Sequence, residues 1–262
     1  ICMCTCVEKV SLMLFSEADV EPAPSMKSAI ESFSLELRVK IYEKLSTGHG
    51  GVRMQDKILI SGFDPFGGEP VNPACELLRI LDGKLLDGYH IVTQEIPTAR
   101  FRAAEMLHSA ITREDPAVIL ALGQAGGYSE IAVERVAINV DDYRIPDNDG
   151  NQPVDEPVVE GGPAAYWSTL PIRSMVRAMR EVEVPAFVSN SAGTFVCNHL
   201  FYRLMRFLEE EGGVRRGGFI HVPYMLEQAE RLGQPGLPLE VMARGLEAAV
   251  RAAVAVCGEG EL

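Results

Sequence analysis

Short runs rich in β-branched residues alternate along this chain with longer stretches that carry the apolar spacing of helices. The strand-like runs are residues 58–61, 91–96, 117–122, 133–140, 186–189 and 219–222. Strands that alternate with helices build βαβ units, whose sheets contain parallel pairs and are covered on both faces. We therefore expect a single three-layer α/β/α globule with a twisted, largely parallel central sheet.

Residues with known capping roles mark the helices. Asn72 precedes Pro73, which suits the cap and first position of a helix, and Thr98 is placed to cap a helix that runs to about residue 112. The other helical patterns cover residues 171–180, 194–210 and 239–256. Residues 141–162, with their Asp, Asn, Gly and Pro, form a connection too long for a simple turn, so we expect it to have a function.

The first 53 residues differ in pattern from the rest. They open with a Cys-x-Cys-x-Cys run and end near a Ser- and Gly-rich stretch, residues 46–51, that is typical of a flexible linker. Met54 stands just before the first clear strand. We expect residues 1–53 to be an N-terminal extension outside the functional fold, and residues 54–262 to form the functional α/β domain.

Charge and hydropathy narrow the classes of partner. The 37 acidic and 24 basic residues give a formal net charge of -13, which repels nucleic-acid phosphates and anionic lipid surfaces. The longest purely apolar runs are about six residues, far short of the roughly 20 that cross a bilayer. The N-terminal segment lacks a basic leader, and the six cysteines lack the spacing of a disulfide framework. We expect a cytoplasmic protein with reduced thiols and neither nucleic-acid nor membrane partners.

Several common catalytic motifs are missing from the sequence. It has no Gly-x-Ser-x-Gly elbow, no His-Glu-x-x-His pair, no P-loop, and no Gly-x-Gly-x-x-Gly after a strand. The N-terminal cysteine run has no second ligand cluster, so we expect no structural metal site. Candidate chemistry therefore falls on unusual residues at strand ends, where open α/β sheets bind their ligands.

Cys197 is the candidate nucleophile. It follows the strand at 186–189 and lies in the first turn of the helix that begins near Thr194. Unpaired N–H groups and the helix dipole stabilise a thiolate there, and the same N–H groups can hold an oxyanion. Packing is the alternative interpretation, because Cys197 shares an apolar helix face with Phe201 and Leu204, and free cysteines are often buried.

A nucleophilic cysteine requires a base, and two histidines lie near it in the chain. His199 is only two residues away, about 200° around the helix, which favours a surface or packing role. His221 lies near the end of the strand at 219–222, at the sheet edge where Cys197 emerges. His221 is therefore the candidate base, with a structural role as the alternative.

A third group is needed to orient the imidazole through its second nitrogen. The candidates are Glu130, Glu134, Asp141 and Asp142. Glu134 lies within a strand-like run, where a buried carboxylate needs a partner. Taken alone, the residues favour a surface pair between Glu134 and Arg135.

Two further strand ends have the composition of pocket walls. Phe63 and Phe66 lie on a glycine-rich loop after the first strand, where they are placed to sandwich a flat ligand. Gln124 follows the third strand and offers a neutral hydrogen-bond donor and acceptor at the same edge. Ordinary turn chemistry explains either segment equally well.

Six motifs in order along the chain carry a resemblance to a known family. They are GFDPFGG (62–68), GQAGG (123–127), ERVAIN (134–139), RIPDN (144–148), SAGTFVCN (191–198) and FIHVP (219–223). Together they resemble pyroglutamyl peptidase type I, or pyrrolidone-carboxylate peptidase, a family of cytosolic cysteine exopeptidases. The resemblance covers about residues 54–227, matches the C-terminal helix only in type, and departs at Tyr128, on the pocket rim.

The resemblance implies removal of an N-terminal pyroglutamyl residue from peptides. It makes Cys197 the nucleophile and His221 the base, and it makes Glu134 the orienting acid in place of the surface role that the residues alone favour. The substrate pocket that it implies consists of Phe63, Phe66, Thr98, Gln124, Ile145, Phe195 and Val196, with Arg144 on the oxyanion side. It also implies a homo-oligomer, a dimer or tetramer, that works without a metal or cofactor.

Two other classes remain open at this point. A different thiol-dependent amidase or acyl hydrolase would share the cysteine, histidine and glutamate but not the lactam pocket. A non-catalytic protein that binds a small ligand on the same fold would keep the pocket without a reactive thiol.

Overall fold

The computed structural model describes residues 57–258, and the side chains of residues 57–255. The predicted N-terminal extension, residues 1–53, lies outside the described residues. A seven-stranded sheet has the order β2-β3-β1-β4-β9-β5-β8. Its strands are β1 (Lys57–Phe63), β2 (Leu85–Leu86), β3 (Tyr89–Ile96), β4 (Val118–Gln124), β5 (Ile131–Glu134), β8 (Ala186–Ser189) and β9 (Arg216–Val222).

Most neighbouring strands of the sheet are parallel. β3, β1, β4 and β9 run parallel in that order, and so do β5 and β8. β5 is antiparallel to β9, and the short β2 is antiparallel to β3. The residues of β4 are all buried, as expected for a central strand covered by helices on both faces. The predicted α/β class and the largely parallel sheet are confirmed.

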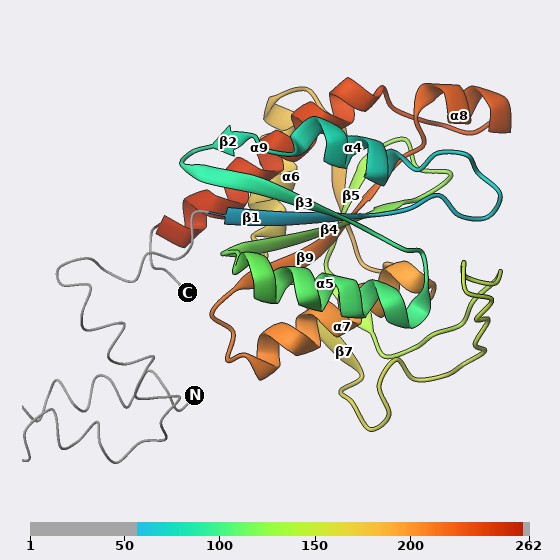
Figure 1. Cartoon of the computed structure of the whole chain (residues 1–262). Coiled ribbons are helices and arrows are strands. Elements are labelled where there is room, and N and C mark those ends of the chain that lie inside the picture. Colours follow the sequence, from blue (N-terminus) through green and yellow to red (C-terminus); the bar gives the residue numbers. More distant parts are fainter. Residues whose placement is uncertain (1–56, 259–262) are drawn as a thin grey trace, which may run out of the picture. The chain divides into compact units, whose positions relative to one another are not determined.

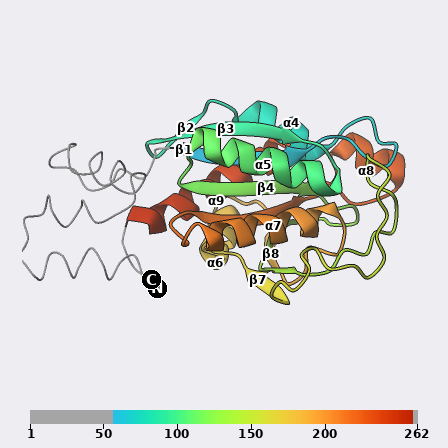
Figure 2. The same ribbon diagram turned by 60° about the horizontal axis from the view of Figure 1, so that its bottom comes forward.

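Helices cover both faces of the sheet, which gives three layers (Figures 1 and 2). α4 (Pro73–Leu81), α6 (Ile172–Glu181) and α9 (Leu239–Gly258) lie on one face. α5 (Arg100–Glu114) and α7 (Val196–Glu210) lie on the other, and the short α8 (Leu226–Leu232) follows β9. None of the helices within residues 57–258 has the length and apolar character needed to cross a membrane.

The helix starts test the predicted caps. The side chain of Asn72 accepts a hydrogen bond from the N–H of Ala74, and Pro73 is the first residue of α4, as predicted. The prediction for Thr98 is wrong, because α5 has Ala99 at its N-cap, and the N–H of its first residue, Arg100, donates to the Asp147 carboxylate at 2.7 Å. The Thr98 hydroxyl instead donates to the carbonyl of Asp64 at 3.0 Å, which ties α5 to the loop after β1.

The run at 133–140 is not one strand. β5 ends at Glu134, and β6 (Val136–Ile138) pairs with β7 (Ala165–Trp167) in a separate two-stranded sheet. Arg135 lies between them and is half-buried. The chain therefore leaves the central sheet directly after Glu134, so this carboxylate lies at a strand end.

Candidate active site

His221 and Glu134 form a buried pair between two antiparallel strands. His221 lies opposite Ala132 in the register of β9 and β5, and Glu134 is two residues further along β5. This diagonal relation brings a long side chain within reach of its neighbour. Nδ1 of His221 donates to Oε1 of Glu134 at 2.8 Å, and the two residues are 6% and 0% exposed. The carboxylate thus determines which ring nitrogen carries the proton and how the ring is turned.

The neighbours of His221 favour its charged form. Burial of the imidazole opposes the positive charge, but the sulfur of Cys197 and the carboxylate of Glu134 outweigh this effect and raise the pKa of His221 to about 10. The Cys197 sulfur is thus close enough to the imidazole to act on its charge. An imidazolium between a sulfur and a carboxylate matches the ion pair of an activated cysteine.

Cys197 is the second residue of α7. Phe195 is the N-cap, and its side chain makes no capping hydrogen bond, which leaves the N–H groups of the first turn uncapped by that residue. Gly123 lies beside His221 in the register of β4 and β9. A Cβ at Gly123 would come within 2.9 Å of the Cys197 sulfur and 2.8 Å of the Phe219 ring. The glycine therefore leaves the space that the thiol occupies.

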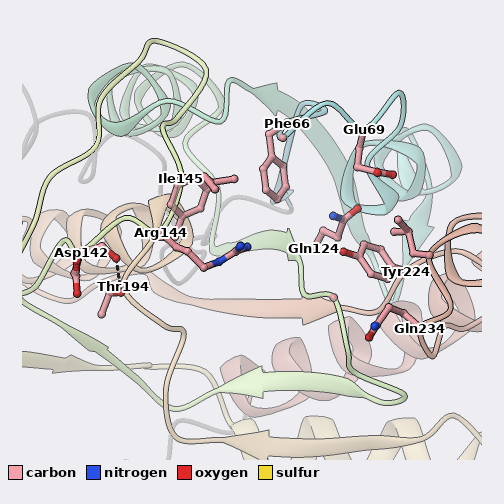
Figure 3. Close-up of a pocket in the computed structure, with 13 residues that line it drawn as sticks. Phe66, Glu69, Gln124, Asp142, Arg144, Ile145, Thr194, Tyr224 and Gln234 are labelled. Carbon is pink, nitrogen blue, oxygen red and sulfur yellow. Dashed lines mark hydrogen bonds between the residues drawn. The ribbon is translucent and has the colours of Figure 1, made fainter.

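A cavity of about 650 Å³ is lined by Phe195, two residues before Cys197, and by Gln124, the residue after Gly123. Cys197 itself is not among its lining residues. Figure 3 shows the side chains of Phe66, Ile145, Arg144 and Gln124 around a common space. Five of the predicted pocket residues line it: Phe66, Gln124, Arg144, Ile145 and Phe195. The cavity thus brings together residues from the ends of β1 and β4, the connection at 141–162 and the start of α7.

Three predicted pocket residues lie outside this lining. Phe63, the last residue of β1, is 1% exposed and packs in the core against Phe219. Its pairing with Phe66 around a ligand stays a prediction. The ring near Phe66 is that of Phe195, with centroids 5.9 Å apart. Thr98 and Val196 are also buried, at 2% and 0% exposure.

The other candidate acids have different partners. Asp141 accepts from Nδ1 of His199 at 2.7 Å and from Nε of Arg100 at 2.8 Å. Asp142 is exposed on the cavity wall, and its carbonyl accepts from the Thr194 hydroxyl at 2.8 Å (Figure 3). The expected surface pair of Glu134 with Arg135 is wrong, because Glu134 is fully buried and Arg135 donates to Asn190 at 2.8 Å.

Comparison with known sequences places this arrangement in a family. The sequence profile described as pyroglutamyl peptidase matches residues 56–256. The chain belongs to the pyroglutamyl peptidase family. It is 50% identical over 200 residues to a pyrrolidone-carboxylate peptidase of Bacillus cereus and 51% identical over 198 residues to one of Brevibacillus brevis. These matches cover 76% and 75% of this chain, and 93% and 92% of the relatives.

Solved structures agree with this assignment. The crystal structure of pyroglutamyl peptidase I from Bacillus amyloliquefaciens superposes with a TM-score of 0.75 at 46% identity, and covers 76% of this chain and 97% of that one. The pyrrolidone carboxyl peptidase of Thermococcus litoralis has a TM-score of 0.75 at 37% identity, over 78% and 96% of the two chains. The resemblance inferred from the six motifs is confirmed.

The pyroglutamyl peptidase cavity also includes residues that sequence reasoning missed. These are Gly67, Glu69, Gly126, Asp142, Thr194, Tyr224, Leu232 and Gln234. Tyr224 had a usable signal, since it lies two residues after the end of β9 and strand ends carry the ligand sites of open sheets. Leu232 had none, because it belongs to α8, a helix too short to stand out from its flanking residues.

Proposed function

We propose that this pyroglutamyl peptidase family member removes N-terminal pyroglutamyl residues with Cys197 as nucleophile, His221 as base and Glu134 as the acid that orients the imidazole. The observation that carries the proposal is the buried 2.8 Å hydrogen bond between Glu134 and His221, an imidazole whose pKa the sulfur of Cys197 also raises. This order of thiol, imidazole and carboxylate is the one that nucleophilic catalysis requires.

The steps follow from these positions. His221 holds the proton of Cys197, and the thiolate attacks the pyroglutamyl carbonyl carbon to give a tetrahedral oxyanion. The first-turn N–H groups of α7 and the Arg144 guanidinium stabilise that oxyanion. The C–N bond then breaks, His221 protonates the leaving amine, and water, deprotonated by His221, hydrolyses the thioester to release pyroglutamate and free thiol.

The cavity supports a neutral ring as the ligand. Phe66 and Phe195 offer aromatic surface, Ile145 adds an aliphatic wall, and Gln124 supplies an uncharged polar group. Glu69, on the same lining, is ion-paired with Arg231. A lactam has no charge to desolvate, whereas a peptide that begins with open-chain glutamine must bring in an ammonium group, which costs several kcal/mol when unpaired.

The test compares amine release from two otherwise identical amides, one pyroglutamyl and one glutaminyl, at pH 7. We expect kcat/KM for the pyroglutamyl substrate to be at least roughly 100-fold to 1000-fold higher. Cys197→Ser is expected to abolish release, since a hydroxyl is a far weaker nucleophile, while Cys75→Ser retains it. Equal rates for the two amides would contradict the lactam specificity and assign Asp142 or Glu69 as an acceptor for ammonium.

Cys75 is a matched control for thiol chemistry. Its side chain is buried within α4 and hydrogen-bonded to Glu95 at 3.0 Å. Burial, together with the Glu95 carboxylate, raises the pKa of Cys75 to about 12. Iodoacetamide is therefore expected to modify Cys197 well before Cys75, and protection of Cys197 by 2-pyrrolidone would separate a pyroglutamyl site from that of another thiol amidase.

We also propose that residues 54–262 are sufficient for activity and that residues 1–53 are an extension of the catalytic domain. The family match begins at residue 56, which supports this boundary. A chain that begins at Met54 is expected to keep kcat/KM within about threefold of the full chain. Loss of activity or solubility in the shortened chain would contradict the proposal.

The cellular setting is proposed from the same family and from composition. We propose a cytoplasmic dimer or tetramer, and the net charge of -13 favours solubility in that compartment. Large apolar side chains exposed on the described part of the chain, such as Phe101 at 55% and Trp167 at 68%, offer surface for self-association. Light scattering after size exclusion tests the oligomer, and a single-chain mass would contradict it.

A further inference from the structure

Gln228 on α8 is a buried amide whose two ends have different partners. The residue is 2% exposed, and its Nε2 donates to Oε2 of Glu69 at 3.2 Å and to the carbonyl of Val71 at 3.1 Å. Its Oε1 accepts from the N–H of Met225 at 3.4 Å. Because acceptors surround one end and a donor faces the other, the amide can be placed in only one orientation.

Glu69 strengthens this assignment. The hydrogen bond from Arg231 holds the pKa of the Glu69 carboxyl below its ordinary value. Glu69 is therefore an anion at neutral pH and accepts hydrogen bonds without donating any. The nitrogen of Gln228, and not its oxygen, must face this carboxylate.

The same nitrogen reaches the cavity residue Gln124. Oε1 of Gln124 lies 3.2 Å from Nε2 of Gln228, so the two hydrogens of this nitrogen serve three acceptors and the Gln124 oxygen shares one of them. Rotation of that amide by 180° would set two amino groups against each other. Within the described residues, no acceptor is hydrogen-bonded to Nε2 of Gln124, and Figure 3 shows this nitrogen turned toward the side of the cavity that holds Phe66.

We propose that Gln228 is a positioning residue that holds the Gln124 amide with its amino group toward the cavity, where it donates to the ring carbonyl of the bound lactam. The inference rests on the proposed function and adds a specificity determinant to it. Gln124 recognises a hydrogen-bond acceptor on the ring. Gln228, which does not line the cavity, determines that the amino group of Gln124, and not its oxygen, faces the ligand. A neutral amide could otherwise serve as donor or acceptor equally well.

The experiment compares two substrates that differ at this acceptor alone. A pyroglutamyl amide and its 5-thioxoprolyl counterpart share the ring N–H, but the thiocarbonyl sulfur is a weak hydrogen-bond acceptor. We expect the wild-type protein to favour the oxo substrate by at least about tenfold in kcat/KM, mostly through KM. Gln228→Met cannot hold the Gln124 amide, and we expect its preference to fall below about threefold.

The ratio of the two substrates separates positioning from general damage. A purely structural role for Gln228 would lower the rates for both substrates alike and leave their ratio unchanged, which would overturn the inference. Glu230→Gln, on the exposed side of α8, is the matched control and is expected to keep the wild-type ratio. A wild-type ratio near one would overturn the inference without any variant.

Two further outcomes are distinguishable. If Gln228→Met does not fold, Gln228→Leu is a second uncharged variant that cannot donate to Gln124, and the same loss of preference is expected. If the wild-type protein cleaves neither amide, the proposed function fails. If it cleaves the oxo substrate and Gln228→Leu keeps the preference, only the role of Gln228 fails.

Discussion

Two buried histidine–carboxylate pairs lie near the start of α7, and they differ in their third partner. His221 bonds Glu134 at 2.8 Å, and His199 bonds Asp141 at 2.7 Å, in both cases through Nδ1. All four residues are at most 6% exposed. Judged by distance and burial alone, the two pairs are equivalent.

The charges around the two carboxylates separate them. Oδ2 of Asp141 also accepts from Nε of Arg100 at 2.8 Å, and Arg100 reaches Glu156 at 2.8 Å as well. Arg100 is always charged, so Asp141 has a permanent counterion. Among the described residues, the cation beside Glu134 is the one that forms when His221 binds a proton. A proton on His221 therefore completes an ion pair with Glu134. His199, in contrast, bonds a carboxylate, Asp141, that is already paired with Arg100.

The comparison teaches that a histidine–carboxylate hydrogen bond does not by itself indicate catalysis. The pair without a permanent counterion, next to a thiol, suits proton transfer. The pair with an arginine is suited to a structural role, because Asp141 links Arg100 of α5 and His199 of α7 to the connection at 141–162. Three predictions test this division.

The largest expected difference is in turnover. An asparagine nitrogen can replace Nδ1 of histidine and keep the carboxylate bond, but it has no counterpart of Nε2. We expect His221→Asn to lower kcat by about 10²- to 10⁴-fold with the fold intact, because proton transfer is lost. His199→Asn should keep kcat within about threefold. Steady-state kinetics on a pyroglutamyl amide measure both, and equal losses would contradict the division.

The second expected difference is in stability, where the pair of His199 and Asp141 is expected to contribute more than the pair of His221 and Glu134. Asp141→Asn leaves Arg100, whose side chain is 11% exposed, with one fewer anion, and we expect the free energy of unfolding to fall by about 2–4 kcal/mol. Glu134→Gln takes the carboxylate from His221, but an imidazole, unlike a guanidinium, can release its proton, so this variant should cost less than Asp141→Asn. Urea unfolding followed by circular dichroism at pH 7 gives both values. A larger loss for Glu134→Gln would show that the central pair is the structural one.

The smallest expected effect is a change in titration. The folded pKa of His221 is raised above its ordinary value of about 6.5, so its protonation stabilises the fold fully below about pH 6.5. That contribution is lost as the pH rises through the folded pKa, at about 10. Glu134→Gln removes one of the groups that raise it, so the His221 pKa should fall. NMR of the imidazole Cε1–H, assigned with His221→Asn, measures the change, and an unchanged pKa would exclude Glu134 as a stabiliser of the imidazolium.

The sequence alone was sufficient for the class of fold, and it also supplied the three residues of the mechanism that we propose. Alternating strand and helix patterns predict a covered, mostly parallel sheet, because period and composition are local properties of a segment. The strand ends and the first turn of a helix indicate Cys197 and His221 for the same reason. Glu134 depended on the family resemblance, since a glutamate beside an arginine looks like a surface pair.

The tertiary structure alone decided which side chains meet. Phe63 and Phe66 lie three residues apart, yet one ring is in the core and the other faces the cavity, because β1 ends between them. Gln228 is 104 residues from Gln124, and Glu134 is 87 residues from His221. Sheet register and the return of α8 over the strand ends create these contacts. These contacts join residues far apart in the sequence, so no local pattern predicts them. The helices and strands that hold the residues are local, and the spacing of apolar residues predicts them.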